Sequence, residues 1–287
     1  MKAIYKKEVK SYLTSMIGYV FIFFILLLEG IYFTAYNLQN AYPLFGTTLS
    51  AITFIFLILV PVLTMKTIAE ERKQKTDQLL LTAPVSVSEI VLGKFLAVAT
   101  VYAIPVVIIC LYPLIMGKYG TVSYGMAYTA VLGFALLGFA QIAVGVFWSS
   151  VTENPVIAAV ITFIVLFVCY MITGIGSLIP DSSMASLACY MLLVLLAAVW
   201  IYHMIRNLWI AAVVGIAGEA ALAITYVVKS TLFEGSIQKF LAVFDITSHF
   251  DNFTNGILDL QGVVYFLSVI IIFLVLTVQT ITKRRWN

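Results

Sequence analysis

Long apolar segments constrain this chain more than any other feature of its sequence. A helix that crosses a lipid bilayer needs roughly 20 mostly apolar residues, and eight segments meet that length. They are residues 16–36, 47–66, 94–116, 124–150, 155–179, 186–204, 208–228 and 262–282. A soluble domain of 287 residues could not bury so much apolar surface. The sequence therefore predicts an all-α integral membrane protein with about eight transmembrane helices.

The composition supports this class. Hydrophobic residues make up 63% of the chain, charged residues 10%, and the mean hydropathy is +1.09, whereas soluble domains are about 25% charged. The net charge of +3 comes from basic loops, so we expect no nucleic-acid partner. The cysteines Cys110, Cys169 and Cys189 lie in apolar segments without metal-ligand spacing. We expect small buried hydrophobic residues there and no metal site.

Basic residues predict the orientation of the chain in the membrane. With a cytoplasmic N-terminus, the outside holds only Lys118, Lys229 and Lys239. The inside then holds Lys2, Lys6, Lys7, Lys10, Lys66, Arg72, Lys73, Lys75, Lys94, Arg206, Lys283, Arg284 and Arg285. This bias places both termini in the cytoplasm. Only about three residues, 205–207, separate the sixth and seventh segments, so these two form a hairpin that crosses or leaves the membrane as a unit.

Three polar stretches flank the apolar segments. Residues 1–15 carry an apolar face at helical spacing with lysines on the other side, which predicts an amphipathic interfacial helix. That face comprises Tyr5, Val9, Tyr12, Leu13 and Met16. Residues 229–261 are too polar to cross a bilayer and are predicted to form an extracellular segment with a short amphipathic helix. No linker or repeat interrupts the chain, so residues 1–287 are predicted to be one membrane domain.

The third polar stretch, residues 67–93, concentrates charge between the second and third predicted spans. The spacing of Thr67 and Glu70 is that of a capping box, which predicts a helix from there to residue 82, before Pro84. Ser86 and Glu89 have the same spacing and are expected to begin the third span. A solvated connector is the simpler interpretation. However, a connector needs only a few residues, and the apolar residues 79–81 suit docking to a partner.

The stretch EERKQKTDQLLLTAPVSVSEIVLGKF resembles the segment between the second and third spans of ABC-2-type permeases. Family members commonly read E-E-R-x-x-G-T-x-E-x-L-L-x-[ST]-P-[VL]-S, followed by G-K at the start of the third span. This chain retains Glu70, Glu71, Arg72, Thr76, Leu79, Leu80, Pro84, Ser86, Gly93 and Lys94. It has Lys75 where Gly is usual, which we expect to favour helix and stiffen this point. It has Gln78 where Glu is usual, which removes a charge that could pair with an ATPase.

A second phrase precedes the last predicted span and is similar to the gliding-motility-type branch of these permeases. That branch reads F-x-x-F-x-x-G-[IV]-[IL]-D, which corresponds here to Phe250, Phe253, Gly256, Ile257, Leu258 and Asp259. The resemblance thus extends over nearly the whole chain. The hairpin at residues 186–228 departs from the commoner six-span plan of the family.

The resemblance implies a permease subunit of an ABC exporter. The chain has no G-x-x-x-x-G-K-[ST] stretch, so we expect no enzymatic activity and no cofactor of its own, with ATP and Mg²⁺ held by a separate cytoplasmic ATPase dimer. The coupling residues it implies are Glu70, Glu71, Arg72, Thr76, Leu79, Leu80, Pro84 and Ser86, and the outer-gate residues are Phe250, Phe253, Gly256 and Asp259.

Further partners follow from the same resemblance. We expect a second copy of the permease or a related one, membrane lipid, and an auxiliary protein with an extracellular domain. The expected location is the plasma membrane of a bacterium, as a multi-pass protein.

Two carboxylic acids lie inside predicted spans, where a charge costs several kcal/mol unless it is paired. Glu219 sits mid-span among small residues, as a contact for a substrate or proton or as a packing contact. Glu29 is nearer the outer end of its span, where its side chain can reach the interface. An ion-gradient-driven secondary transporter using these two residues is the alternative function, although no inverted repeat is evident. An intramembrane enzyme lacks a nucleophile–base pair or metal motif within the spans.

Overall fold

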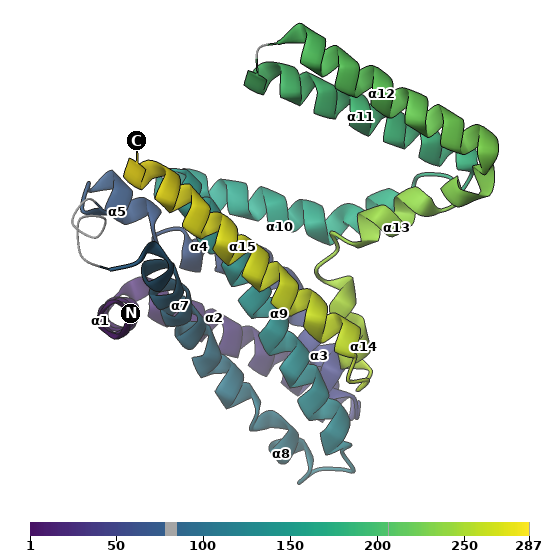
Figure 1. The fold of residues 1–287 in the computed structure, drawn as a ribbon. Helices are drawn as coiled ribbons and strands as arrows, with labels where there is room; N and C mark the ends of the chain where they lie inside the picture. The colour runs from purple at the N-terminus through teal and green to yellow at the C-terminus, as the bar shows by residue number, and fades with distance from the viewer. Residues whose placement is uncertain (78–84, 206, 287) are drawn as a thin grey trace. The chain divides into compact units, whose positions relative to one another are not determined.

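The structure is a computed structural model that describes residues 1–77, 85–205 and 207–286. These residues form helices joined by short connections, and no strand occurs among them (Figure 1). The prediction of an all-α protein is therefore confirmed for the described part of the chain. Continuous apolar sequence allows only helices here, because a helix satisfies its own backbone hydrogen bonds within a bilayer.

Seven of the described helical stretches are long and apolar enough to cross a membrane. They are Met16–Gln39, Phe45–Lys73, Val87–Met116, Tyr124–Val151, Pro155–Ser177, Ser183–His203 and Leu260–Arg284. A further pair, Ala212–Val228 and Ser230–Ala242, passes the same test but is bent by 116°. The described residues therefore contain seven candidate spans, or eight if that pair is counted as one.

The chain folds into two compact units, where the sequence predicts one membrane domain. The first unit comprises Met1–Val168 together with Ile246–Asn287, and the second comprises Cys169–Asp245. Helix α10 (Pro155–Ser177) begins in the first unit and ends in the second.

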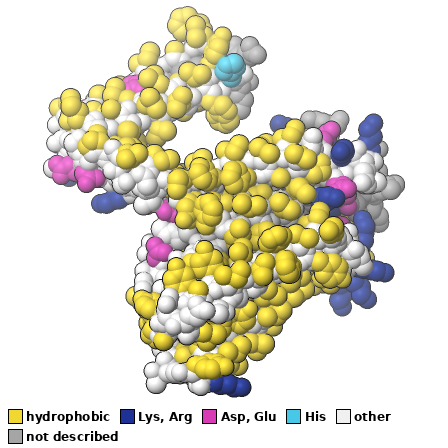
Figure 2. Space-filling view, turned by 180° about the vertical axis from the view of Figure 1, so that it is seen from behind, with side chains coloured by type: hydrophobic (Ala, Val, Ile, Leu, Met, Phe, Trp, Pro, Cys, Tyr) yellow, Lys and Arg dark blue, Asp and Glu magenta, His cyan; other side chains and the backbone are white. Residues whose placement is uncertain are grey.

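The first unit contains most of the spans. Its helices before α10 are α1 (Lys2–Thr14), α2 (Met16–Tyr32), the π-helix η1 (Phe33–Gln39), α3 (Phe45–Ile52), η2 (Thr53–Ile55), α4 (Phe56–Thr64), α5 (Ala69–Lys73), α7 (Val87–Ile109), α8 (Tyr112–Met116) and α9 (Tyr124–Val151). Its helices after the second unit are η4 (Ser248–Phe250), α14 (Asp251–Thr254) and α15 (Leu260–Trp286). Figure 2 shows that basic side chains on the face in view gather at one end of this unit, beside acidic ones.

Helix α9 is the centre of the first unit, and α3, α4, α7 and α15 pack against it. Glycines on α9 allow this close approach. A Cβ atom at Gly138 would lie 2.3 Å from the Tyr102 ring, and one at Gly145 would lie 2.2 Å from Thr64 Oγ1. The Tyr102 hydroxyl donates a 2.7 Å hydrogen bond to the Phe134 carbonyl, which satisfies the polar tip of this buried ring. Small residues and satisfied polar groups thus hold the spans together.

The second unit is built on the predicted hairpin. Helices α11 (Ser183–Ile205) and α12 (Leu208–Val228) lie side by side, followed by η3 (Ser230–Phe233) and α13 (Ser236–Ala242). The two long helices pack closely at Gly218, where an added Cβ atom would lie 2.8 Å from Val194 Cγ1. The Phe233 ring contacts the rings of Tyr190 and Tyr226, one from each long helix.

Candidate functional site

The loop that follows α4 begins with the short helix α5, whose first turn is capped from another span. The predicted capping box at Thr67 is wrong, because its hydroxyl donates instead to the Thr64 carbonyl at 2.8 Å. The Ser149 hydroxyl of α9 accepts hydrogen bonds from the backbone N–H groups of Ile68 (3.0 Å) and Ala69 (3.1 Å). It also donates to the Met65 carbonyl. These bonds attach the start of the loop to α9.

The helix that begins at Ala69 ends at Lys73, where the sequence predicts one continuous helix, and residues 78–82 of that prediction lie outside the described residues. Lys75 has a φ of +57°, the left-handed conformation that favours glycine. The N–H of Thr76 donates to the Glu71 carbonyl (2.9 Å) and that of Lys75 to the Arg72 carbonyl (3.1 Å), which is a Schellman motif. The expectation that Lys75 favours helix is therefore wrong. The backbone therefore makes at Lys75 a turn that glycine adopts more readily than lysine.

A buried lysine joins this loop to two other helices. Lys94 of α7 is only 2% exposed, and its Nζ atom lies 2.9 Å from Glu71 Oε2 and 3.2 Å from Glu8 Oε1 of α1. It also donates a 2.7 Å hydrogen bond to the carbonyl of Thr67. An ammonium group has three protons to donate, and all three acceptors are present here. This set, called the Lys94 cluster below, consists of Glu8, Thr67, Glu71 and Lys94.

Helix α1 packs on this region along α7. Its Tyr12 hydroxyl lies 3.0 Å from Thr67 Oγ1 and donates to the Leu63 carbonyl at 3.2 Å. Burial raises the pKa of Tyr12 well above its usual value, so the phenol stays protonated. The predicted helix at residues 1–15 is confirmed. Its inward face packs on protein and includes Glu8, whereas Met16 is 80% exposed.

Arg72 makes a second connection, to the end of α9 and to α15. Its guanidinium donates to the Ser150 carbonyl and, at 3.2 Å, to Glu153 Oε1. Arg284 of α15 lies 3.1 Å from the same carboxylate and 3.7 Å from Asp77 Oδ2. The loop is thus held by α1, α7, α9 and α15.

The structure separates the predicted coupling residues into two groups. Glu71 and Arg72 point inward, and only 17% and 8% of their side chains are exposed. Thr76 is exposed, as are its neighbours Lys73, Gln74 and Lys75, which were not among the predicted coupling residues. Glu70 pairs with Lys66 at 3.2 Å. Ser86 caps α7 by accepting from the N–H of Glu89 at 3.3 Å, which confirms that capping prediction. Leu79, Leu80 and Pro84, and the departure at Gln78, lie outside the described residues.

Sequence reasoning missed several residues of this site. Glu8 stands among lysines, and its position one turn before Tyr12 on the inward face was the available signal. Ser149 and Arg284 carried none, because they approach the loop from spans distant in sequence. The arrangement contains ion pairs and hydrogen bonds between helices, so its chemistry is that of a mechanical connection. No group of three or more metal-ligating side chains occurs among the described residues.

The predicted outer-gate residues Phe250, Phe253, Gly256 and Asp259 lie in the segment before α15, which is called the outer motif below. Phe250 and Phe253 are fully buried, and Phe253 packs against α9 where Gly133 leaves room, since a Cβ there would lie 2.5 Å from Phe253 Cβ. Gly256 ends α14 with a φ of +77°. Asp259 caps α15 by accepting from the N–H of Gln261 at 2.9 Å. A hydrogen bond from Asn252 lowers the pKa of Asp259 below its usual value.

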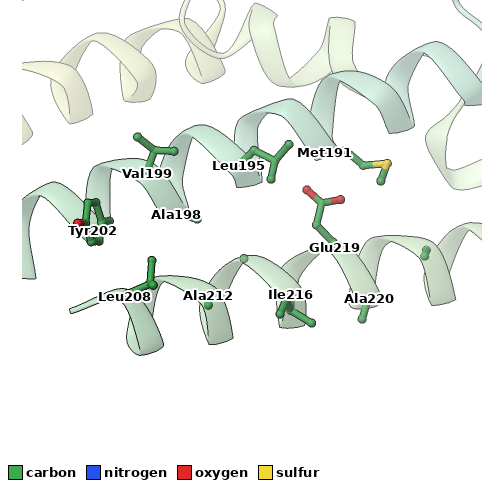
Figure 3. A pocket seen from close by; sticks show the side chains of 12 residues that line it. Met191, Leu195, Ala198, Val199, Tyr202, Leu208, Ala212, Ile216, Glu219 and Ala220 are labelled. Carbon is green, nitrogen blue, oxygen red and sulfur yellow. The ribbon is translucent and has the colours of Figure 1, made fainter. Parts of the chain in front are cut away.

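The two intramembrane carboxylic acids differ in their surroundings. The expectation that Glu29 reaches the interface is wrong, because its side chain is completely buried on the inward face of α2. Glu219 of α12 is directed toward α11, between Leu195 and Met191 (Figure 3). Neither carboxyl group has a hydrogen-bond partner among the described residues.

The comparisons with known proteins agree with this fold. No curated protein matches the chain. The family model described as ABC-2 family transporter protein matches residues 29–278, which include α5, most of the Lys94 cluster and the outer motif. With its apolar helices, the chain is a multi-pass membrane protein and the membrane subunit of an ABC transporter. The chain belongs to the ABC-2 transporter family.

Proposed function

We propose that this subunit is driven by a separate cytoplasmic ATPase dimer, which binds the loop between α4 and α7. One observation carries the proposal: the described part of this loop is attached by side-chain bonds to α1, α7, α9 and α15. A passive connector needs no such attachment. A loop that receives force does, because force applied to it must reach the spans.

The proposal assigns different roles to the two groups of loop residues. The exposed positions Lys73, Gln74, Lys75 and Thr76, with the adjoining residues 78–84, contact the ATPase. The inward residues Glu71 and Arg72 transmit the movement of the ATPase. Glu71 passes it through Lys94 to α7 and α1. Arg72 passes it to the end of α9 and, through the Glu153 carboxylate that it shares with Arg284, to α15. Breaking a buried ion pair by removing one partner typically costs about 3–5 kcal/mol, so the buried Lys94–Glu71 pair is expected to persist while the loop moves.

The remaining parts of the assembly follow from the family. ATP and Mg²⁺ bind to the ATPase, since this chain lacks the phosphate-binding loop. A second copy of the permease or a related permease completes the translocation pathway, and the direction of transport is export from a bacterial cell across its plasma membrane. We also propose that the outer motif, Phe250 to Asp259, belongs to the outer gate. Its likeness to the phrase of the gliding-motility-type branch supports assigning the subunit to that branch.

The experiment separates binding of the ATPase from coupling to it. The tagged chain is co-purified with the ATPase encoded beside it, and ATP hydrolysis is measured in nanodiscs. Lys73→Glu/Lys75→Glu reverses two exposed charges and is expected to lose the ATPase from a folded permease. Lys94→Met is expected to retain the ATPase while ATP-dependent movement of α1, followed by a spin label at exposed Lys10, is lost.

Lys118→Glu, a charge reversal in the loop between α8 and α9, is the matched control. It is expected to change neither the retention of the ATPase nor the ATP-dependent movement of α1. The proposal is wrong if the Lys73/Lys75 variant binds the ATPase as the wild type does and Lys94→Met still couples hydrolysis to movement.

A gradient-driven transporter is the second candidate, favoured by the buried, unpartnered carboxyl group of Glu29. It predicts uptake or efflux in vesicles that depends on an ion gradient, needs no ATP, and is abolished by Glu29→Gln.

A further inference from the structure

The hairpin of α11 and α12 carries an open groove that the coupling proposal does not use. Its volume is about 690 Å³, within the range of pockets that hold small molecules. Aliphatic side chains and small residues from both helices form the walls, among them Met191, Leu195, Ala212 and Ala220. Glu219 is the one acidic residue among those that line it.

The carboxyl group of Glu219 lies at the floor of this groove without a partner. Figure 3 shows it directed from α12 toward α11. Both oxygens are buried, and neither has a hydrogen-bond partner among the described residues. A buried acid without a donor is costly, so an occupant that supplies a donor at this point would be stabilised strongly.

We infer that the groove binds a lipophilic amine, with the nitrogen at Glu219 and the apolar body along the aliphatic walls. Charge complementarity selects the amine, because an acid in an apolar groove is best matched by a basic group. The walls exclude a hydrophilic cation such as a polyamine, which would lose its hydration without replacement.

The position of Glu219 decides between a free amine and a lipid headgroup. It lies 9 to 11 residues from the ends of α12 at Leu208 and Val228, or about 14–16 Å at 1.5 Å per residue. The amino group of a phospholipid stays at the membrane surface and cannot reach this depth. A free amine enters the groove uncharged. The amine nitrogen then shares a proton with the Glu219 carboxyl group, and no other reactant is needed.

The test measures binding to the full chain in phosphatidylcholine nanodiscs without ATP, so a failure of the coupling proposal does not affect it. The probe is N,N-dimethyl-4-(pyren-1-yl)butylamine, and the neutral comparison is the corresponding methyl ether. Energy transfer to pyrene from tryptophan reports binding, since Trp200 and Trp209 are exposed on the hairpin. The wild type is expected to bind the amine at least tenfold more tightly than the ether.

Two variants locate the site. Glu219→Gln keeps the shape, removes the acid, and is expected to bind the amine no better than the ether. Ala220→Leu narrows the groove beside Glu219, leaves the acid in place, and is expected to weaken amine binding at least fivefold. Ala217→Leu adds the same bulk on an exposed position of α12 that does not line the groove, and is expected to bind as the wild type does.

Three results would overturn the inference. The first is a preference for the amine that survives in Glu219→Gln. The second is displacement of the amine when phosphatidylethanolamine replaces half of the lipid, which would assign the groove to a headgroup. The third is no amine binding together with a smaller complex mass for Glu219→Gln in light scattering, which would assign the groove to a partner helix.

Discussion

The ammonium nitrogen of Lys94 lies 2.9 Å from Oε2 of Glu71, and this contact joins the loop after the second span to the third span. Both side chains are largely buried, and the same nitrogen also reaches Glu8 of α1. Two acids and one base meet there, with Lys7 as an exposed second cation 3.5 Å from Glu71. The contact therefore determines both the position of the loop and the position of α1.

Replacing Lys94 by Met is expected to lower the free energy of unfolding by about 3–5 kcal/mol, because two buried carboxylates lose their partner. Adding Glu71→Gln and Glu8→Gln to this variant should recover much of the loss, since no buried charge then remains. Lys7→Met removes an exposed cation and should cost about 1 kcal/mol or less. Unfolding in mixed micelles measures all three. Equal losses for Lys94→Met and Lys7→Met would contradict the structural role of Lys94.

Ser149→Ala is expected to destabilise the protein by about 1–3 kcal/mol, because two backbone N–H groups at the start of α5 lose their acceptor. Ser150→Ala is the matched control. It is equally buried, but its hydroxyl donates only to the Phe147 carbonyl of its own helix, and the carbonyl that Arg72 uses is retained. Hydrogen exchange at Ile68 and Ala69 should rise in the first variant alone. Unchanged exchange there would show that another group caps α5.

The sequence predicts the helices well and the contacts between them poorly. Apolar length alone places seven or eight candidate spans, because the bilayer leaves few alternatives to a helix. The cap at Ser86 is also predictable, since its acceptor and donor are three residues apart. The cap on α5 is not, because Ser149 is about eighty residues away and nothing local marks it.

The two errors at the loop share a starting point. Local propensity predicts a cap at Thr67 and helix at Lys75, and the structure has neither. The Thr67 hydroxyl is engaged with Thr64 and Tyr12, so it cannot cap. Lys75 has a good helix-forming side chain, yet the chain turns there. The pattern that the loop resembles has glycine at this position, and glycine would have indicated the turn. This chain has lysine there, so its own sequence does not indicate it.

Lys75→Gly is therefore expected to stabilise the loop by about 0.5–1 kcal/mol, because a residue with a Cβ atom is strained at a φ of +57°. Lys75→Ala is the control, since it removes the same charge and keeps the strain, and it should give no gain. Limited proteolysis of the loop and unfolding in mixed micelles test the difference. A larger gain for alanine than for glycine would show that the charge of Lys75, and not its backbone conformation, is unfavourable.

Gly256→Ala is expected to cost about 2–5 kcal/mol, from the positive φ and from overpacking together. At this position φ is +77°, and a Cβ atom would lie 2.5 Å from Met126 Cγ and 2.9 Å from its Cα, which cannot move away as a flexible side chain can. Gly235→Ala separates the cost of the positive φ from the cost of overpacking. Its φ is +63° but no atom lies within 4 Å of the added Cβ, so it should cost only about 1–2 kcal/mol. Unfolding in mixed micelles gives both values. Similar losses at the two glycines would mean that α9 does not pack against the end of α14 as closely as the structure has it, and the outer motif would then lack its anchor.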